Sequence, residues 1–428
     1  MPAPRRTPPR HPRRAALACL LLTGCAFLRL PEEVEEIQQH GVAAVVVRGA
    51  PAGCTTFAVA WRERVDERGE TSREFIGLHP VDGDGVAFFL LANEHTYHVA
   101  AFADVDGDGA YDVGEPAALR GGVAPKPLDE QGDPADRTEL SLAAASVLPD
   151  DLALEPAPTE LGQALEIDIG EVASLDEPRF GKQAGERGMW EPFGFFAEHG
   201  LGLYFVEPYD PERVPVLFVH GIADGPATFT DAIAALDRER QQAWFFHYPS
   251  GFRVGKVADG LAAALRRLRR EHGFERLSIV AHSMGGLVAR DAIQQLASGE
   301  PRVRVDRFVT VSTPWSGHAA ATIGVDFLRH PVPAWRDLVP GSAFLQRVVG
   351  APLPEGTTHD LVFGFCTQGG VGMPNDNDGV VGVESQLAPA VQRSARSVFG
   401  LPCDHHAILH DERAIAAVRR ALRDAAQD

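Results

Sequence analysis

The chain has 428 residues, with 59 acidic and 40 basic side chains and a formal net charge of −19. At roughly 150 residues per domain, this length predicts two or three domains, and a hydrophobic content of 45% is enough to form sizeable cores. The acidic balance argues against sequence-independent binding to nucleic acid, which requires clustered Lys and Arg side chains. No apolar run approaches the roughly 18 residues of a membrane-spanning helix, which excludes a polytopic membrane protein.

Residues 1–24 are predicted to be a secretory signal peptide. They contain five arginines and no acidic residue, and the arginines are followed by the short apolar stretch Ala15–Leu22. A basic segment, a short apolar core and small residues before a cleavage point are typical of such signals. The tetrapeptide Leu-Thr-Gly-Cys that ends at Cys25 also resembles the lipobox of bacterial lipoproteins, in which the cysteine is acylated. An ordinary signal peptide with an incidental cysteine is the alternative.

Acylation of Cys25 predicts a protein body anchored to the bacterial cell envelope, because two or more acyl chains anchor a protein stably. Ala26 stands where an aspartate is associated with retention in the inner membrane, which favours the outer membrane. Export also permits a disulfide between remaining cysteines. Cys54 lies in a different predicted domain, which favours the pair Cys366–Cys403, and two free thiols there are the alternative.

The rest of the chain is predicted to form two domains. Residues 25–145 contain short segments rich in β-branched and aromatic residues, separated by Gly, Pro and Asp-Gly steps, which indicate a small antiparallel β-sandwich. Residues 146–185 are predicted to be a linker, because their first part is rich in Pro, Asp, Glu and Ala. In residues 186–428, apolar strands alternate with amphipathic helices, which predicts a mainly parallel sheet with helices on both faces.

The expected strands are short and apolar in both domains. Those of the sandwich are Val42–Val47, Thr55–Trp61, Val86–Leu91, Tyr97–Phe102 and about Glu139–Ala143. Those of the second domain are Pro215–Val219, Gln242–His247, Arg276–Ala281, Arg307–Val311 and Asp360–Phe365.

Ser283 is the candidate nucleophile. It stands in Ala281-His282-Ser283-Met284-Gly285-Gly286, between a predicted strand and a predicted helix. A sharp strand-to-helix turn exposes a serine hydroxyl and requires small residues two positions before and after it, because strand and helix nearly touch. Ala281 and Gly285 satisfy this requirement, although Ala281 departs from the usual glycine. A serine that only caps the helix is the alternative.

Three segments resemble the α/β-hydrolase superfamily, and within it the bacterial triacylglycerol lipases and esterases: Val216–Gly221, Ala281–Arg290 and the segment from Asn375. The resemblance extends roughly from Leu203 to Ala425 and implies an α/β-hydrolase fold behind the sandwich. It also implies that Trp315–Gly350 lies where lipases insert a cap and binds an acyl chain. Packing as additional helices is the alternative for this segment.

The chain order of this fold is Ser, then Asp or Glu, then His. Asp378 precedes a glycine and two apolar residues, as does the acid of lipases, and this resemblance implies that it is the catalytic acid. Asp376 is the competitor, and an Asx turn or a cation-binding loop is the non-catalytic alternative. The spacing of His405 before two apolar helix positions resembles that of the family base, and the adjacent His406 is the alternative.

An oxyanion requires two preorganised backbone N–H groups. The resemblance implies that Met284, directly after the nucleophile, supplies one and that Ile222, after His220-Gly221, supplies the other. We expect His220 and His282 to have structural roles.

A separate acidic segment fits the twelve-residue calcium loop at most ligand positions. Its candidate ligands are Asp104, Asp106, Asp108, Asp112 and Glu115. Five carboxylates in one loop repel each other unless a cation neutralises them, so a structural calcium ion is expected. The flanking sequence argues against the helix pair of a true EF-hand, and a solvated acidic hairpin is the alternative.

The sequence therefore predicts a membrane-anchored serine hydrolase that cleaves carboxylic esters, with acyl lipids as the expected substrates. Catalysis needs no cofactor in this interpretation, and no nucleic-acid partner is expected. A thioesterase, an amidase or an acyltransferase would use the same Ser-His-Asp triad. A non-catalytic binding module of the cell envelope is the alternative from another class.

Overall fold

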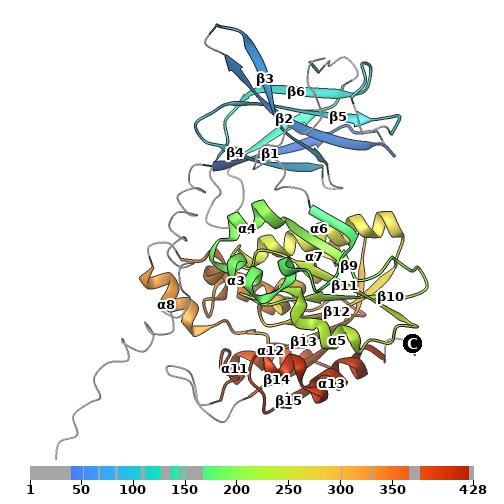
Figure 1. Ribbon diagram of the computed structural model, residues 1–428, viewed down its shortest axis with the longest axis vertical. Coiled ribbons are helices and arrows are strands. Elements are labelled where there is room, and N and C mark those ends of the chain that lie inside the picture. The colour runs from blue at the N-terminus through green and yellow to red at the C-terminus, as the bar shows by residue number, and fades with distance from the viewer. Residues whose placement is uncertain are drawn as a thin grey trace, which may run out of the picture.

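The computed structural model describes residues 40–423, except for 52, 66–67, 82–84, 108–110, 127–135, 144–147, 150–166, 300, 329–330 and 366–375. The predicted signal peptide, Cys25, Asp108 and Cys366 lie outside the described residues. The described chain folds into two β-sheets followed by an α/β unit (Figure 1).

The first part is a sandwich of a three-stranded sheet in the order β4-β1-β7 and a four-stranded sheet in the order β3-β2-β5-β6. Its strands are β1 (His40–Arg48), β2 (Thr55–Val65), β3 (Thr71–Pro80), β4 (Val86–Ala92), β5 (Tyr97–Asp104), β6 (Ala117–Val123) and β7 (Arg137–Ser141). Side chains from both sheets form one core, for example Val45, Phe89, Ala60 and Val99. The sandwich is mainly antiparallel, as predicted, with one exception: β1 pairs with β7 in parallel.

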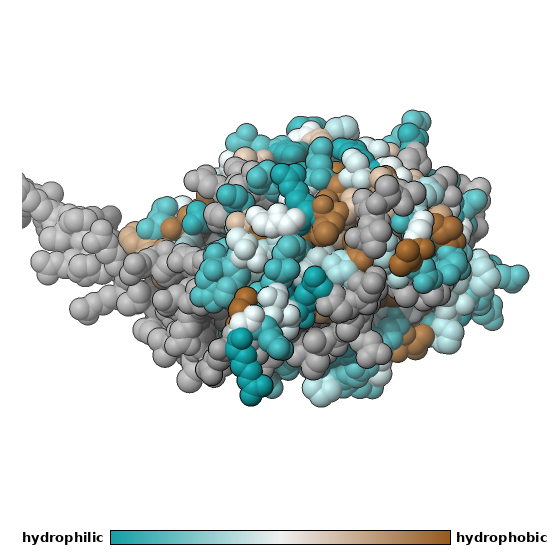
Figure 2. Space-filling model, turned by 90° about the horizontal axis from the view of Figure 1, so that it is seen from above, coloured by the Kyte–Doolittle hydropathy of each residue, from teal (hydrophilic) through white to brown (hydrophobic). Residues whose placement is uncertain are grey.

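The surface seen in Figure 2 is mixed. Hydrophobic residues lie there in small groups between hydrophilic ones, as on an ordinary water-exposed surface. None of the helices in the described part of the chain is long and apolar enough to cross a bilayer.

The second part is built on an eight-stranded sheet in the order β15-β14-β13-β12-β10-β11-β9-β8. Its strands are β8 (Ile167–Val172), β9 (Leu201–Phe205), β10 (Val214–Val219), β11 (Gln241–His247), β12 (Arg276–His282), β13 (Arg304–Val311), β14 (Thr358–Gly364) and β15 (Ser397–Leu401). The six strands from β10 to β15 run parallel, whereas β9 pairs antiparallel with β11. These parallel strands are apolar runs because both of their faces are buried.

Helices cover both faces of this sheet. They are α3 (Lys182–Trp190), α4 (Pro192–His199), α5 (Thr230–Ala234), α6 (Val254–His272), α7 (Met284–Ser298), α8 (Ala319–Phe327), α9 (Pro333–Leu338), α10 (Ala343–Gly350), α11 (Val383–Gln386), α12 (Pro389–Ser394) and α13 (Glu412–Arg423). Short 3-10 helices are η2 (Pro178–Phe180), η3 (Pro226–Phe229) and η4 (Ala407–His410). This mainly parallel sheet with helices on both faces confirms the predicted α/β-hydrolase fold class.

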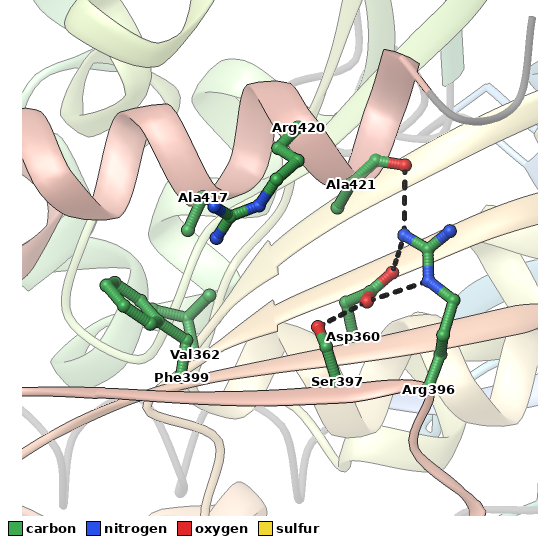
Figure 3. Close-up of a pocket in the computed structure, with 8 residues that line it drawn as sticks. All are labelled: Asp360, Val362, Arg396, Ser397, Phe399, Ala417, Arg420 and Ala421. Atoms are coloured by element: carbon green, nitrogen blue, oxygen red, sulfur yellow. Dashed lines mark hydrogen bonds and ion pairs between the residues drawn. The ribbon is translucent and has the colours of Figure 1, made fainter.

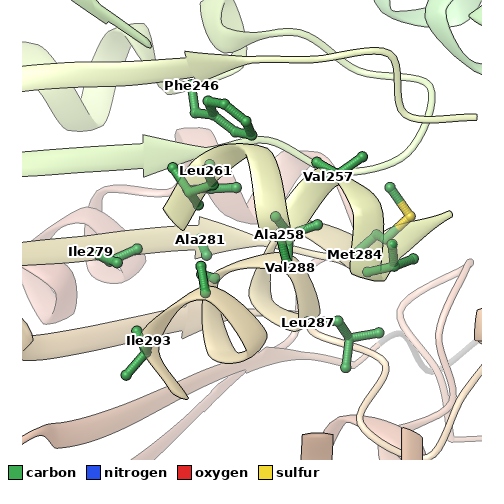
Figure 4. Close-up of a cluster of buried hydrophobic side chains, with 14 of the residues drawn as sticks. Phe246, Val257, Ala258, Leu261, Ile279, Ala281, Met284, Leu287, Val288 and Ile293 are labelled. Carbon is green, nitrogen blue, oxygen red and sulfur yellow. The ribbon is translucent and has the colours of Figure 1, made fainter. Parts of the chain in front are cut away.

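The alternation of side chains along the strands divides the core into two layers. Ile279 and Ala281 of β12 pack under α6 and α7, as Figure 4 shows. Val280 points to the other face, where α5 and α13 contribute buried side chains such as Ile233 and Val418. The two layers hold β12 rigidly, and the nucleophile candidate follows directly at its end.

The expected boundary of the linker requires a correction. Residues 146–185 contain β8, η2 and the beginning of α3, and β8 pairs in parallel with β9 at the edge of the eight-stranded sheet. The α/β unit therefore begins before residue 186. The Pro- and Glu-rich composition of the segment's first part concealed the short alternating strand at its end.

Candidate active site

Ser283 lies in the turn between β12 and α7 with a strained backbone. Its φ is 53° and its ψ is −129°, a region that residues with a side chain rarely adopt. Its N–H donates a hydrogen bond to the carbonyl of Val311 on β13 (2.8 Å), which helps to hold this conformation. Strained backbones of this kind are concentrated at functional sites, where the surrounding structure compensates for them.

The glycines around Ser283 allow the strand and the helix to approach each other. A Cβ atom on Gly285 would lie 2.3 Å from the carbonyl oxygen of His220 and 2.4 Å from that of Val219. A Cβ atom on Gly221 would lie 2.8 Å from the Cβ of Ser283. The loop after β10 is thus in direct contact with the turn that carries the serine.

Ser283, His405 and Asp378 form one chain of hydrogen bonds. The Oγ of Ser283 lies 2.9 Å from Nε2 of His405, and Nδ1 of His405 lies 2.7 Å from Oδ2 of Asp378. Asp378 is fully buried and the other two side chains are each 4% exposed. A base between a hydroxyl and a buried carboxylate is the arrangement that activates a serine.

The carboxylate of Asp378 is held by its own loop. Its Oδ1 accepts hydrogen bonds from the N–H groups of Val380 (3.0 Å) and Val381 (2.7 Å). Burial raises the pKa of Asp378, but the hydrogen bond with His405 and these two N–H groups outweigh burial and lower the pKa overall. Asp378 is therefore charged at neutral pH and can stabilise a protonated His405.

His282 fixes the backbone of His405, the candidate base. Its Nε2 lies 2.8 Å from the carbonyl oxygen of His405, to which it donates. Burial holds the pKa of His282 well below its usual value, so the ring is neutral, and among the described residues its Nδ1 has no hydrogen-bond partner. His282 therefore has a specific structural contact, because the residue before the candidate nucleophile holds the main chain of the candidate base.

The two predicted oxyanion donors are Met284, which directly follows Ser283, and Ile222, which follows Gly221 in the loop that approaches Ser283. Met284 is the first residue of α7, so its N–H has no acceptor within the helix. Ile222 follows Gly221 and precedes Ala223, which has a left-handed φ of 54°. The hydroxyl of Ser250 accepts the N–H of Ala223 at 3.0 Å and holds this loop in place.

The alternative residues lie elsewhere. His406 is half exposed, and its Nδ1 faces Asp224 at 3.9 Å rather than the serine. Asp376 is exposed, and its backbone carbonyl accepts the N–H of Val383. The structure thus brings His405 and Asp378 to Ser283, and not their competitors.

His220 stacks on Tyr248 with ring centroids 4.1 Å apart, and its Nδ1 lies 2.9 Å from the carbonyl oxygen of Gly221. This is the packing role that we expected. Cys403 has a free thiol that donates to Oδ2 of Asp411 at 3.2 Å.

Sequence reasoning missed three residues that brace the site: Ser250, Gln386 and His318. The amide of Gln386 accepts the N–H of Gly364 and donates to the carbonyl of Val381. The available signal in the sequence was the presence of these polar residues within the α/β unit. The sequence does not reveal what they contact.

The acidic segment of the sandwich brings three of its five candidate ligands together. Asp104, Asp106 and Glu115 each offer a carboxylate oxygen, and these oxygens lie within 4.8 Å of one another. Both oxygens of Glu115 also accept backbone N–H groups, those of Val105 (2.6 Å) and Asp112 (3.1 Å). Asp112 does not belong to this group of three. An all-oxygen donor set of carboxylates fits Ca²⁺.

A pocket at the N-terminal end of β14 and β15 is separate from the group of Ser283, His405 and Asp378 (Figure 3). Asp360 lies in it, accepts Nη2 of Arg396 at 2.8 Å and Oγ of Ser397 at 2.5 Å, and Arg420 of α13 lines the opposite wall. The buried carboxylate of Asp360 is thus neutralised by Arg396, and the pocket lies between the strands β14 and β15 and the helix α13.

Comparison with known proteins gives one family match. Residues 254–330, which contain Ser283, match the family described as "Putative serine esterase (DUF676)". No curated protein matches the chain.

Several solved structures are similar to about half of the chain. The mature lipase BlEst2 of Bacillus licheniformis is 21% identical, with 48% of this chain and 92% of that chain covered and a TM-score of 0.38. The product of gene lin2722 of Listeria innocua is 14% identical, with 49% and 94% covered and a TM-score of 0.39. Phospholipase PlaB of Legionella pneumophila is 16% identical, with 50% and 61% covered and a TM-score of 0.39.

Proposed function

We propose that this protein is a serine hydrolase that cleaves carboxylic esters, a lipase or esterase, through an acyl-enzyme. The observation that carries the proposal is the hydrogen-bonded chain from Ser283 through His405 to the buried Asp378, at a strained turn between strand and helix. The match of residues 254–330 to a serine esterase family supports it.

In the first half of the reaction, Oγ of Ser283 attacks the ester carbonyl while Nε2 of His405 takes the hydroxyl proton. Asp378 stabilises the imidazolium that results. The carbonyl oxygen becomes an oxyanion, which the N–H groups of Ile222 and Met284 stabilise; loss of one such donor typically lowers the rate by about 10²–10³. The intermediate then expels the alcohol, which takes the proton from His405.

In the second half, His405 removes a proton from water, and the resulting hydroxide attacks the acyl-enzyme carbonyl. Collapse of the second intermediate releases the carboxylic acid and returns the proton to Ser283 Oγ. The same residues act in both halves, so a change in any one of them slows acylation and deacylation together.

We further propose that the substrates are acyl lipids and that the segment from α8 to α10 binds the acyl chain. Within this segment, the apolar side chains of Ile323 (41% exposed) and Phe327 (79% exposed) on α8 lie on the surface. An apolar acyl chain is the substrate class that such side chains would contact favourably.

Hydrolysis of a panel of p-nitrophenyl esters by the wild type and by Ser283→Ala tests the proposal. We expect turnover that depends on chain length in the wild type and its loss in the variant. Ser298→Ala, at the exposed end of α7, is the matched control and should retain activity. Wild-type turnover no higher than that of Ser283→Ala on every ester would refute the hydrolase. Faster cleavage of thioesters or amides, or acyl transfer to an alcohol, would replace the ester substrate by one of those classes.

We also propose that acylated Cys25 anchors the protein in the bacterial envelope, with the outer membrane favoured. The lipobox-like tetrapeptide supports this proposal. Mass spectrometry of the mature N-terminus tests it: a diacylated Cys25 is expected, and an unmodified cysteine or a cleavage site elsewhere would contradict it.

Finally, we propose that the group of Asp104, Asp106 and Glu115 holds a calcium ion that stabilises the sandwich. The converging carboxylate oxygens support this proposal. The ion would neutralise their mutual repulsion and has no part in the ester reaction.

A further inference from the structure

His318 contacts both the helix α8 and the loop that carries Asp378, which we call the acid loop. It lies between β13 and α8 and caps the N-terminus of α8, where its Nδ1 accepts the N–H of Ala320 at 3.2 Å. Its Nε2 lies 2.7 Å from the carbonyl oxygen of Val380 in the acid loop. Because Nδ1 is an acceptor, the proton of the neutral imidazole is on Nε2, which therefore donates to Val380.

The peptide group that His318 contacts is also the one that holds the catalytic carboxylate. The carbonyl of Val380 and the N–H of Val381 belong to the same planar peptide unit. That N–H donates to Oδ1 of Asp378 at 2.7 Å, while the other oxygen of Asp378 bonds to His405. A hydrogen bond to the carbonyl end of a rigid peptide therefore fixes the direction of its N–H end.

We infer that His318 is a positioning residue for the reaction: it orients the Val380–Val381 peptide and, through it, the carboxylate of Asp378. The inference rests on the proposed function, because it assigns His318 to the same triad. His318 does not touch the reacting atoms, and it acts by keeping Asp378 aligned with Nδ1 of His405.

Two neighbouring side chains, Ser385 and Gln386, form hydrogen bonds with peptide groups other than the Val380–Val381 peptide. Ser385 connects the same two segments through backbone groups of Ser316 and Gly317, with its Oγ donating to Gly317 at 2.7 Å. Gln386 bonds to the carbonyl of Val381, which belongs to the following peptide unit. Burial lowers the pKa of His318, so the ring keeps one donor and one acceptor at neutral pH.

Two substitutions separate the positioning role from a purely structural one. Serine is a good helix N-cap, so His318→Ser keeps the cap of α8 but is too short to reach Val380. His318→Gln retains an N–H donor on a longer side chain. His410→Ser is the matched control, because His410 lies five residues after the base but bonds to Asp231 at 2.7 Å and not to the triad.

We expect His318→Ser to lower kcat about tenfold, the effect of losing one hydrogen bond of ordinary strength. KM and Tm should stay close to those of the wild type, His318→Gln should recover most of kcat, and His410→Ser should equal the wild type. Wild-type kcat in His318→Ser, or equal losses in the Ser and Gln variants, would overturn the inference.

A second readout does not require turnover. The proton between His405 and Asp378 gives a far-downfield NMR resonance when the pair is aligned, and we expect it to shift or broaden in His318→Ser and to be unchanged in His410→Ser. An unchanged resonance in His318→Ser contradicts the positioning role. If the wild type cleaves no ester but the resonance responds as expected, the proposed function fails and the positioning role stands.

Discussion

Nε2 of His282 lies 2.8 Å from the carbonyl oxygen of His405, so the adjacent residues His282 and Ser283 hold the main chain and the ring of His405. Ser283 bonds to the imidazole, and His282 bonds to its main chain. Ser283 and His405 come from segments 122 positions apart in the chain, and these two bonds keep them in register.

Replacement of His282 by phenylalanine keeps the ring and removes the donor. We expect His282→Phe to lower kcat about tenfold with little change in KM, because one hydrogen bond that orients the base is lost. Steady-state kinetics on a p-nitrophenyl ester measures this. His79→Phe, a change of another histidine, which packs beside Phe89 in the sandwich, should leave kcat unchanged. A His282→Phe enzyme with the wild-type kcat would contradict the role of this bond.

Gly285→Ala should damage both stability and activity. The added methyl group would meet the carbonyl oxygens of His220 at 2.3 Å and of Val219 at 2.4 Å, at the end of β10, so α7 must move away from the strand. Overpacking of this kind typically costs about 1–3 kcal/mol. Urea unfolding measures the loss. Gly350→Ala is the control, because a Cβ there meets nothing within 4 Å, and it should be close to neutral. Equal stability of the two variants would show that the close approach is not required.

Calcium should raise the Tm of the sandwich, and a chelator should lower it. Three carboxylates of the loop, those of Asp104, Asp106 and Glu115, approach each other closely, and a divalent cation removes their repulsion. Thermal unfolding in calcium and in EDTA measures the difference for the wild type and for Asp106→Asn. The difference should shrink in the variant and remain in the control Asp136→Asn, an exposed aspartate before β7. Identical Tm values with calcium and with EDTA would rule out a stabilising ion.

Stability should fall as the pH is lowered below about 6.5. Burial lowers the pKa of His359 to about 3 and that of His220 to about 4. Between the unfolded value near 6.5 and these folded values, the unfolded chain binds protons that the folded protein does not bind, so acid favours unfolding. Each such histidine contributes a slope of about 1.4 kcal/mol per pH unit in this range.

Removal of one of these histidines should flatten the slope. His359 packs against Phe308 and bonds to Thr310, outside the triad. We expect the free energy of unfolding of His359→Gln to depend less steeply on pH between 7 and 5 than that of the wild type, as measured in urea. Parallel slopes would mean that His359 takes up protons at the same pH in the folded and unfolded protein, which would contradict a lowered pKa.

The sequence was sufficient for the parts of the site that follow from local pattern. The turn that carries Ser283 needs small residues at 281 and 285, so it could be predicted. The parallel strands before it are continuous apolar runs and could be predicted as well. Resemblance to lipases added the order of the acid and the base. Their competitors, Asp376 and His406, could be separated only by their contacts in three dimensions.

The parts of the fold and of the site that the sequence did not predict depend on contacts between distant segments. β3 and β6 of the sandwich carry charged side chains or a Gly-Gly step, which weaken the strand pattern, and their pairing with β2 and β5 compensates for this. The short strand β8 is likewise specified by its pairing with β9. The role of His318 depends on one bond to a carbonyl 62 positions away, which no periodicity reveals.

Trapping of the acyl-enzyme tests the central claim most directly, because the claim is that Ser283 forms a covalent ester with the substrate's acyl group. The protein is mixed rapidly with a p-nitrophenyl ester and quenched in acid, and the peptides are analysed by mass spectrometry. We predict a burst of p-nitrophenol of about one equivalent and an acyl group on the peptide that contains Ser283, both lost in Ser283→Ala. Turnover without acylation of Ser283, or acylation of a different residue, would contradict the account.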